Sequence, residues 1–162
     1  MHFKLLPVKE DKYTSMGMIN VYAQLFLDPG DEGYDKYIAE HLVTVDGVEQ
    51  FNPFCTHSIQ FEHDATEEEI LWCFEWALGI THQNYLKDDL HCKKDGQVVN
   101  QPFHYIARKA FYEGVSMIPE DDRSDYMKTE MAKTDKAKGR VSKIKNVDFG
   151  NVKTIGKYRV RK

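Results

Sequence analysis

Cysteine and histidine residues form two short pairs with the ligand types of a zinc site. One pair is Cys55 and His57, and the other is His91 and Cys92. Alternate residues of a strand face the same side, which suits the first pair, whereas adjacent residues of an extended segment face opposite sides. Neither pair has the usual spacing of zinc ligands, so we expect buried cysteines, surface histidines and no cofactor, with structural zinc as the alternative.

Acidic residues offer a second kind of chemistry, the binding of magnesium in a nuclease or phosphatase. Asp88 and Asp89 lie close to His91, and Glu62 lies two residues before Asp64. Clustered acids in loops are usually solvated, and the chain has no glycine-rich phosphate loop, nucleophile elbow or HExxH helix. The sequence therefore favours a protein that is not an enzyme, and a metal-dependent hydrolase is the third hypothesis.

Cys73 lies in a segment whose apolar residues recur at helical spacing. A capping box at residues 66–69 and a first turn of three glutamates mark the start of this segment. The pattern predicts a helix that starts at Thr66 and either ends at Gly79 or continues to Leu86, in which Cys73 is a core residue rather than a nucleophile. Trp72 and Trp76 widen the apolar arc beyond one core, so one tryptophan is expected at a second interface or at the surface.

The remaining elements follow a mixed pattern. The chain before this helix is mostly extended, with a loop over residues 31–35 and Asp46-Gly47 as a hairpin turn. Strands are predicted over 18–27, 41–45, 48–51 and 57–63. A third, more polar helix is predicted from Ser124 to about residue 136.

A second helix is predicted to begin at Pro102 and to end near Gly114. Its expected buried stripe consists of Phe103, Ile106, Ala107, Ala110 and Phe111. Tyr105, Arg108 and Tyr112 then fall on the exposed side. Such a mixture of aromatic and cationic side chains either stacks on bases or covers the core, and we favour the second interpretation.

Charge is divided unevenly along the chain. Residues 1–127 hold ten Lys or Arg and 23 Asp or Glu, a balance of −13. Residues 128–162 hold twelve Lys or Arg and three Asp or Glu, a balance of +9, and the whole chain carries −4. A basic segment on an acidic body is typical of proteins that bind nucleic acid or another anion. The alternative is that the basic segment contacts its own acidic body.

The last 23 residues predict a basic β-hairpin. With Gly150 and Asn151 as a two-residue turn, Arg140 lies opposite Arg161. One face is then apolar, interrupted by Lys143 and Lys145. The other face collects five further cations: Arg140, Lys153, Lys157, Arg159 and Arg161. Like charges that face each other across a ladder are destabilising unless an anion lies over them.

This hairpin has three interpretations. It binds the phosphates of nucleic acid, it is a solvated edge that protects the fold, or it contacts the acidic body of another copy. We favour phosphate binding with little sequence specificity, because no predicted helix is rich in the Arg, Asn and Gln that read bases. DNA is favoured over RNA.

The sequence as a whole predicts an α+β fold with an antiparallel N-terminal sheet, two main helices and the C-terminal basic hairpin. Its expected parts are an acidic body over 1–120, a polar helix or linker over 121–139 and the basic arm over 140–162. No apolar run is long enough for a membrane span or a secretory signal, so a cytoplasmic protein without a membrane partner is expected. The predicted function is a small accessory or regulatory protein that binds nucleic acid. The alternative is an adaptor or inhibitor that binds a protein partner through the acidic body.

Overall fold

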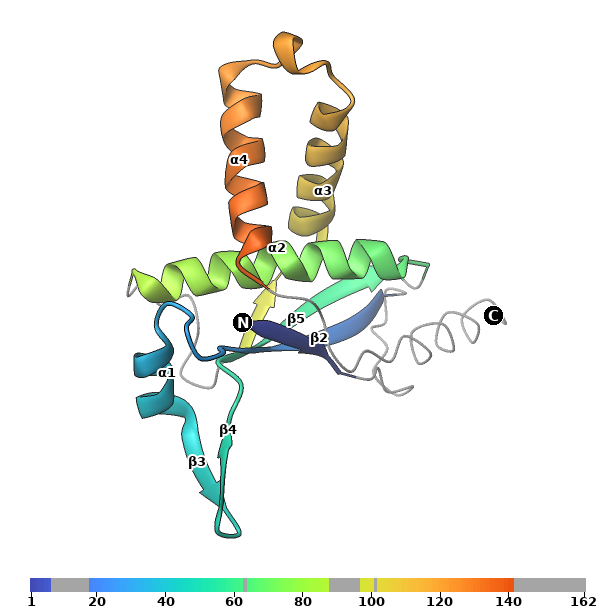
Figure 1. Cartoon of the computed structure of the whole chain (residues 1–162). Helices are drawn as coiled ribbons and strands as arrows, with labels where there is room; N and C mark the ends of the chain where they lie inside the picture. Colours follow the sequence, from blue (N-terminus) through green and yellow to red (C-terminus); the bar gives the residue numbers. More distant parts are fainter. Residues whose placement is uncertain (7–17, 63, 88–96, 101, 142–162) are drawn as a thin grey trace, which may run out of the picture.

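Three layers make up the part of the molecule described by the computed structural model, residues 1–6, 18–62, 64–87, 97–100 and 102–141. A β-sheet forms the first layer, the long helix α2 (Glu67–Leu86) lies across it, and a helical hairpin stands on α2 (Figure 1). The predicted α+β class is confirmed. The predicted C-terminal β-hairpin over 140–162 lies outside the described residues, apart from Arg140 and Val141.

The sheet has four strands in the order β1-β2-β5-β6. Their bounds are His2–Leu5, Met18–Phe26, Cys55–Glu62 and Gln97–Asn100. The first three strands pair antiparallel, as predicted from the sequence. β6, a strand that the sequence analysis did not predict, pairs parallel to β5. The reason is that α2 connects these two strands, and a helical crossover returns the chain in the same direction.

One face of the sheet forms the core beneath α2. Buried residues alternate along β5, where Cys55, His57, Ile59 and Phe61 share this face. Neighbouring strands add Phe3, Leu5, Val21, Ala23 and Leu25, and α2 adds Ile70, Phe74 and Leu78. The alternation of apolar and polar residues predicted a half-buried strand, and its apolar residues are those that face the helix.

Helix α2 starts where the capping box predicted. The Glu69 amide donates to Thr66 Oγ1 at 3.1 Å, and three glutamates occupy the first turn, where they stabilise the helix dipole. The helix continues through Gly79 without interruption. Because α2 is covered by the sheet on one side and by helices on the other, its apolar residues surround most of its circumference.

The helical hairpin consists of α3 (Pro102–Ser116) and α4 (Asp125–Gly139), joined by the 3-10 helix η1 (Glu120–Asp122). The predicted third helix is confirmed, and Ser124 caps it by accepting from the Met127 amide at 3.2 Å. α3 passes through Gly114, which was predicted to end it, because Met117 continues the backbone bonds with a donation to the Glu113 carbonyl.

A second extension leaves the body below the sheet. It consists of β3 (Leu42–Val45) and β4 (Val48–Phe51), which we call the β3–β4 arm, and it follows the short helix α1 (Tyr34–His41). Asp46 and Gly47 have φ values of 51° and 78°, so the predicted two-residue turn with positive φ at both positions is confirmed. α1 was not predicted, and His41 ends it instead of starting β3.

Candidate functional site

Of the seven cations predicted to bind nucleic acid, Arg140 alone lies among the described residues. Lys143, Lys145, Lys153, Lys157, Arg159 and Arg161 lie outside them. Arg140 follows α4 as its C-cap and is half-buried, with Nη1 3.5 Å from Nδ1 of the buried His82. His82 Nε2 lies 2.9 Å from the Glu32 carbonyl oxygen. Arg140 is therefore held against α2 at the point where the basic segment begins.

The solvent face of α4 carries three exposed lysines, Lys128, Lys133 and Lys136. The acids on this helix are partly neutralised. Glu130 accepts from Arg108 and pairs with Lys133, and these interactions hold the pKa of its carboxyl below the usual range. Asp135 accepts a hydrogen bond from the Tyr112 hydroxyl. The outer side of α4 thus carries three exposed lysines against the exposed Asp125 and Asp135, an excess of one positive charge, and the sequence had not singled it out as a site.

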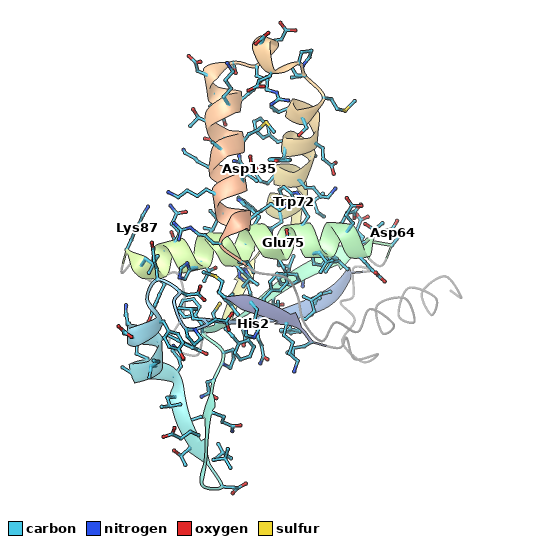
Figure 2. All side chains as sticks on the ribbon, viewed as in Figure 1. His2, Asp64, Trp72, Glu75, Lys87 and Asp135 are labelled. Atoms are coloured by element: carbon cyan, nitrogen blue, oxygen red, sulfur yellow. The ribbon has the colours of Figure 1, made fainter. Side chains whose placement is uncertain are left out.

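Close packing fixes α4 on α2. A Cβ built on Gly79 would lie 1.8 Å from the Ala137 carbonyl oxygen, so the absence of a side chain lets the two helices touch. Lys138 adds an ion pair with Glu75 at 3.5 Å and lies 4.6 Å from the centre of the Trp72 ring. Figure 2 shows Trp72 and Glu75 on α2, with Asp135 on α4 above them.

Arg108 joins the two helices of the hairpin. Its Nε donates to Thr134 Oγ1 at 2.9 Å, and its Nη2 donates to the Glu130 carbonyl oxygen at 2.7 Å and to Oε2 at 3.0 Å. The guanidinium lies 5.7 Å from the Trp76 ring centre. Arg108 is therefore used inside the fold and does not present a free cation to a ligand.

The predicted faces of α3 are reversed at the residues whose side chains the structure describes, which do not include Phe103. Tyr105 and Val115 are buried, and Tyr112 packs on Trp72 with ring centres 5.8 Å apart. The side expected to be buried is largely outward: Ile106 is 41% exposed, Ala107 and Ala110 are exposed, and Phe111 is half-buried. The mixed Tyr–Arg face turns inward because the tryptophans of α2 offer ring faces to cations and ring edges. The expected second interface of the tryptophans is this helix contact.

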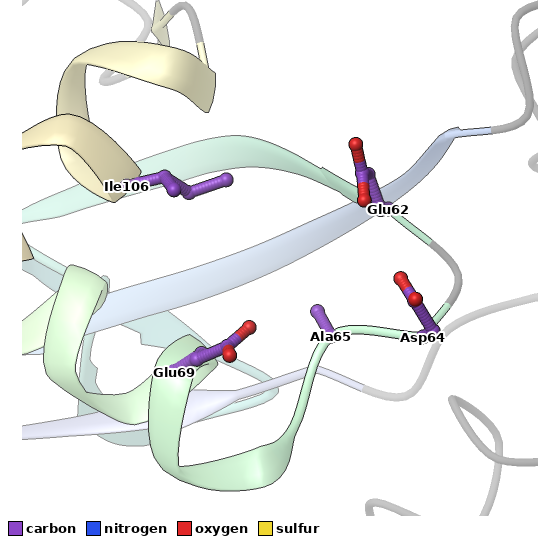
Figure 3. Close-up of a pocket in the computed structure, with 5 residues that line it drawn as sticks. All are labelled: Glu62, Asp64, Ala65, Glu69 and Ile106. Carbon is purple, nitrogen blue, oxygen red and sulfur yellow. The ribbon is translucent and has the colours of Figure 1, made fainter. Parts of the chain in front are cut away.

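An acidic hollow of about 280 Å³ opens where β5 leads into α2. Glu62, Asp64 and Glu69 line it together with Ala65 and the exposed Ile106 of α3 (Figure 3). Carboxylates beside an aliphatic wall suit a Lys or Arg side chain, whose stem is apolar and whose end is charged.

The metal candidates are only partly described. Cys55 and His57 share the buried face of β5, as their spacing predicted, and both lie in the apolar core, so the expected surface position is wrong for His57. Burial lowers the pKa of His57 to about 4, and Tyr105 OH lies 3.4 Å from its Nε2. His91, Cys92, Asp88 and Asp89 lie outside the described residues. Within the described ranges, no group of three or more His, Cys, Asp or Glu side chains could hold a metal ion.

Cys73 is a core residue, as the helical pattern indicated. It is fully buried, and burial raises the pKa of its thiol to about 12. A thiol with this pKa is protonated at neutral pH and is a poor nucleophile.

Comparisons with known proteins add no relative. No protein-family model, no curated protein and no solved structure matches the chain. Among the helices that the structure describes, none has an apolar stretch sufficient to cross a bilayer.

Proposed function

We propose that this is a small non-enzymatic accessory protein that binds nucleic acid, DNA in preference to RNA, mainly through phosphate contacts. The observation that carries the proposal is the basic end of the chain, which has a balance of +9 over residues 128–162 and begins with the exposed Lys128, Lys133 and Lys136 on the outer face of α4. Lysines on a helix surface and in an adjoining basic segment attract the phosphate backbone with little dependence on sequence.

The arrangement of charge supports the same proposal. α4 ends in lysines, which the negative end of the helix dipole stabilises. The close contact of Gly79 with Ala137 fixes this end on α2, so the basic segment starts from an anchored point.

A salt titration of binding to a short duplex DNA and to a single-stranded RNA, measured by fluorescence anisotropy, tests the proposal. Five cations of segment 140–162 on duplex phosphates give a log–log slope of about −4 to −5, and the α4 lysines add to it. Reversal of Lys153, Lys157, Arg159 and Arg161 to Glu should abolish binding. Absence of binding to either probe at about 50 mM salt, where phosphate contacts are strongest, contradicts the proposal.

A matched pair of single variants tests the helix face itself. Lys136→Glu on α4 should weaken DNA binding and lower the steepness of the salt dependence by about 1, the share of one phosphate contact. Lys87→Glu at the end of α2 makes the same charge change away from this face and serves as the control. Equal effects of both variants would mean that net charge, rather than the α4 face, governs binding.

The second candidate function is a protein-binding adaptor or inhibitor. The acidic hollow of Glu62, Asp64 and Glu69 favours it, because this hollow fits a cationic side chain of a partner. One experiment distinguishes nucleic-acid binding from protein binding. Charge reversal of the basic segment should leave such a protein complex largely intact while DNA binding is lost. Glu62→Gln, which removes one carboxylate of the hollow, should weaken the protein complex alone.

A further inference from the structure

The β3–β4 arm exposes an unusual amount of aliphatic surface for a two-stranded hairpin. Val45 and Val48 form a cross-strand pair beside the turn and are 46% and 65% exposed. Leu42 is exposed as well. Among the described residues, β3 and β4 pair only with each other, so the arm is a separate two-stranded sheet with two open edges. Open edges of this kind are where another strand adds.

The arm lacks the charges that usually protect such edges. Native edge strands carry lysines or prolines that discourage pairing with another chain. The chain has no Lys or Arg between residues 37 and 86, a range that holds nine Asp or Glu and includes the whole arm. Of the protective devices, the arm uses only short strand length and two acids, Asp46 and Glu49. These two acids attract a positively charged strand and repel a negatively charged one, so they do not exclude every strand.

The register shows which backbone groups of β4 are open. A two-residue turn makes Val45 and Val48 the hydrogen-bonded pair, so the next pair, Thr44 and Glu49, is of the non-hydrogen-bonded kind. The backbone N–H and C=O of Glu49 therefore point away from β3, toward the free edge. A strand placed along this edge would accept one backbone hydrogen bond from the Glu49 N–H and donate one to the Glu49 carbonyl oxygen.

Side-chain alternation then specifies the incoming strand. Val48 and Glu49 are adjacent and face opposite sides of the arm. At Val48 and Glu49, a strand that pairs with β4 meets an aliphatic side chain on one face and a carboxylate on the other, and Gln50 follows on the face of Val48. Its own side chains must alternate between aliphatic residues and Lys or Arg to complement both.

We propose that the free edge of β4 is a docking site for an extended segment of a protein partner in which aliphatic residues alternate with Lys or Arg. The acids of the arm disfavour a second arm and a nucleic acid, because each would bring further negative charge to the same edge. This inference goes beyond nucleic-acid binding and does not depend on it, since it uses neither α4 nor the basic segment.

Two fluorescent heptapeptides, KVKVKVK and KKKKVVV, test the docking site on the full chain by anisotropy at about 100 mM salt. They have equal composition and charge, so only alternation distinguishes them. We expect the alternating peptide to bind at least about tenfold more tightly. Equal affinities, or no binding of either peptide, would overturn the proposal.

Variants of β4 locate the binding. Glu49→Pro removes the outward N–H without removing a hydrogen bond of the arm, and should abolish the preference for the alternating peptide. Val48→Thr keeps the strand propensity and shape but adds a hydroxyl, so it should weaken binding about threefold even if the proline variant disturbs the arm. The control is Asp121→Asn in η1, at the opposite end of the molecule. It removes one negative charge, as Glu49→Pro does, and should have no effect on peptide binding.

Two further results would identify a different binding site or a different occupant of the β4 edge. A preference for KVKVKVK that survives in Glu49→Pro would overturn the assignment to this edge. Concentration-dependent self-association that Glu49→Pro abolishes, without peptide binding, would identify a second copy as the occupant and also overturn the proposal. DNA binding should be unchanged in all β4 variants, so failure of one function leaves the other measurable.

Discussion

The two extensions of this molecule leave the body in opposite directions and are held in different ways (Figure 1). The α3–α4 hairpin is fixed by helix-to-helix contact at Gly79, by Arg108 between its two helices and by both tryptophans. The β3–β4 arm is attached at its base, where Asn52 donates to the His41 carbonyl and the Tyr37 hydroxyl donates to Asn52.

This difference separates two kinds of stability. Side chains buried between elements make the hairpin part of the cooperative fold. The β3–β4 arm pairs with no other strand among the residues that the structure describes, and a two-stranded sheet by itself is marginally stable in water. The hairpin should unfold with the body, and the arm should open by itself. The following changes test this comparison, from the largest expected effect to the smallest.

Gly79→Ala should have the largest effect, because the added Cβ would meet the backbone of Ala137 rather than a flexible side chain. We expect a loss of about 3 kcal/mol or more in the free energy of unfolding, measured by urea denaturation. The control is Gly114→Ala in α3, where no atom lies within 4 Å of the added Cβ. It should stabilise the protein by about 0.5–1 kcal/mol through helix propensity. Equal effects of the two substitutions would contradict a close contact at Gly79.

Arg108→Met should cost about 2–3 kcal/mol, because it removes the hydrogen bonds to Thr134 and Glu130 and the contact with the Trp76 ring. Ala110→Glu on the outward face of the same helix should change the free energy of unfolding by less than about 0.5 kcal/mol. Thermal and urea denaturation of both variants measure the difference. The opposite ranking would show that the face predicted from sequence periodicity is the buried one.

Acidification should lower the free energy of unfolding through His57 of β5, which contacts Tyr105 of α3. Burial lowers the pKa of His57 from 6.5 to about 4, so the unfolded chain binds a proton more readily than the folded one. The contribution of the neutral His57 to the free energy of unfolding is fully present above about pH 6.5. It falls as the pH drops toward 4, by about 2 kcal/mol at pH 5. Urea denaturation between pH 7.5 and 5 measures this loss, and His57→Gln should remove the share that belongs to His57, while the buried His82, whose pKa burial also lowers, keeps its own share. A pH dependence that is equally steep in the variant would assign it to other groups.

Gly47→Ala should have a small effect that is confined to the arm. Its φ of 78° is unfavourable for alanine by about 1–2 kcal/mol, although the added Cβ meets no atom within 4 Å. Hydrogen exchange of amides in β3 and β4 should accelerate, while exchange in α2 and the urea midpoint of the whole protein remain nearly constant. A loss of global stability would show that the arm folds together with the body.

Local signals in the sequence predicted most of the elements. Thr66 and Ser124 cap helices where their side chains indicated, and Asp46-Gly47 forms the expected turn. These predictions succeed because the cause lies within a few residues of the effect. α1 was missed because it is largely polar and is stabilised mainly by burial of Tyr37, which depends on distant parts of the chain.

The orientation of α3 shows what sequence periodicity omits. Ile106, Ala107 and Ala110 form a regular apolar stripe, yet Tyr105, Arg108 and Tyr112 face the fold. The deciding partners are Trp72 and Trp76, about thirty residues earlier on α2, and no local pattern contains this information. The lysines of α4 were likewise overlooked because only the folded structure reveals which of them reach solvent.

The two tryptophans have a practical consequence. They are the only tryptophans in the chain, and both lie where α2 meets the helical hairpin. Intrinsic emission therefore originates from this one contact, with tyrosine rings and the cations of Arg108 and Lys138 close to the indoles. A ligand that tilts the hairpin shifts the emission spectrum, whereas a peptide on the β3–β4 arm leaves it unaltered. Tryptophan fluorescence of the unlabelled protein thus reports on the α3–α4 hairpin and not on the β3–β4 arm.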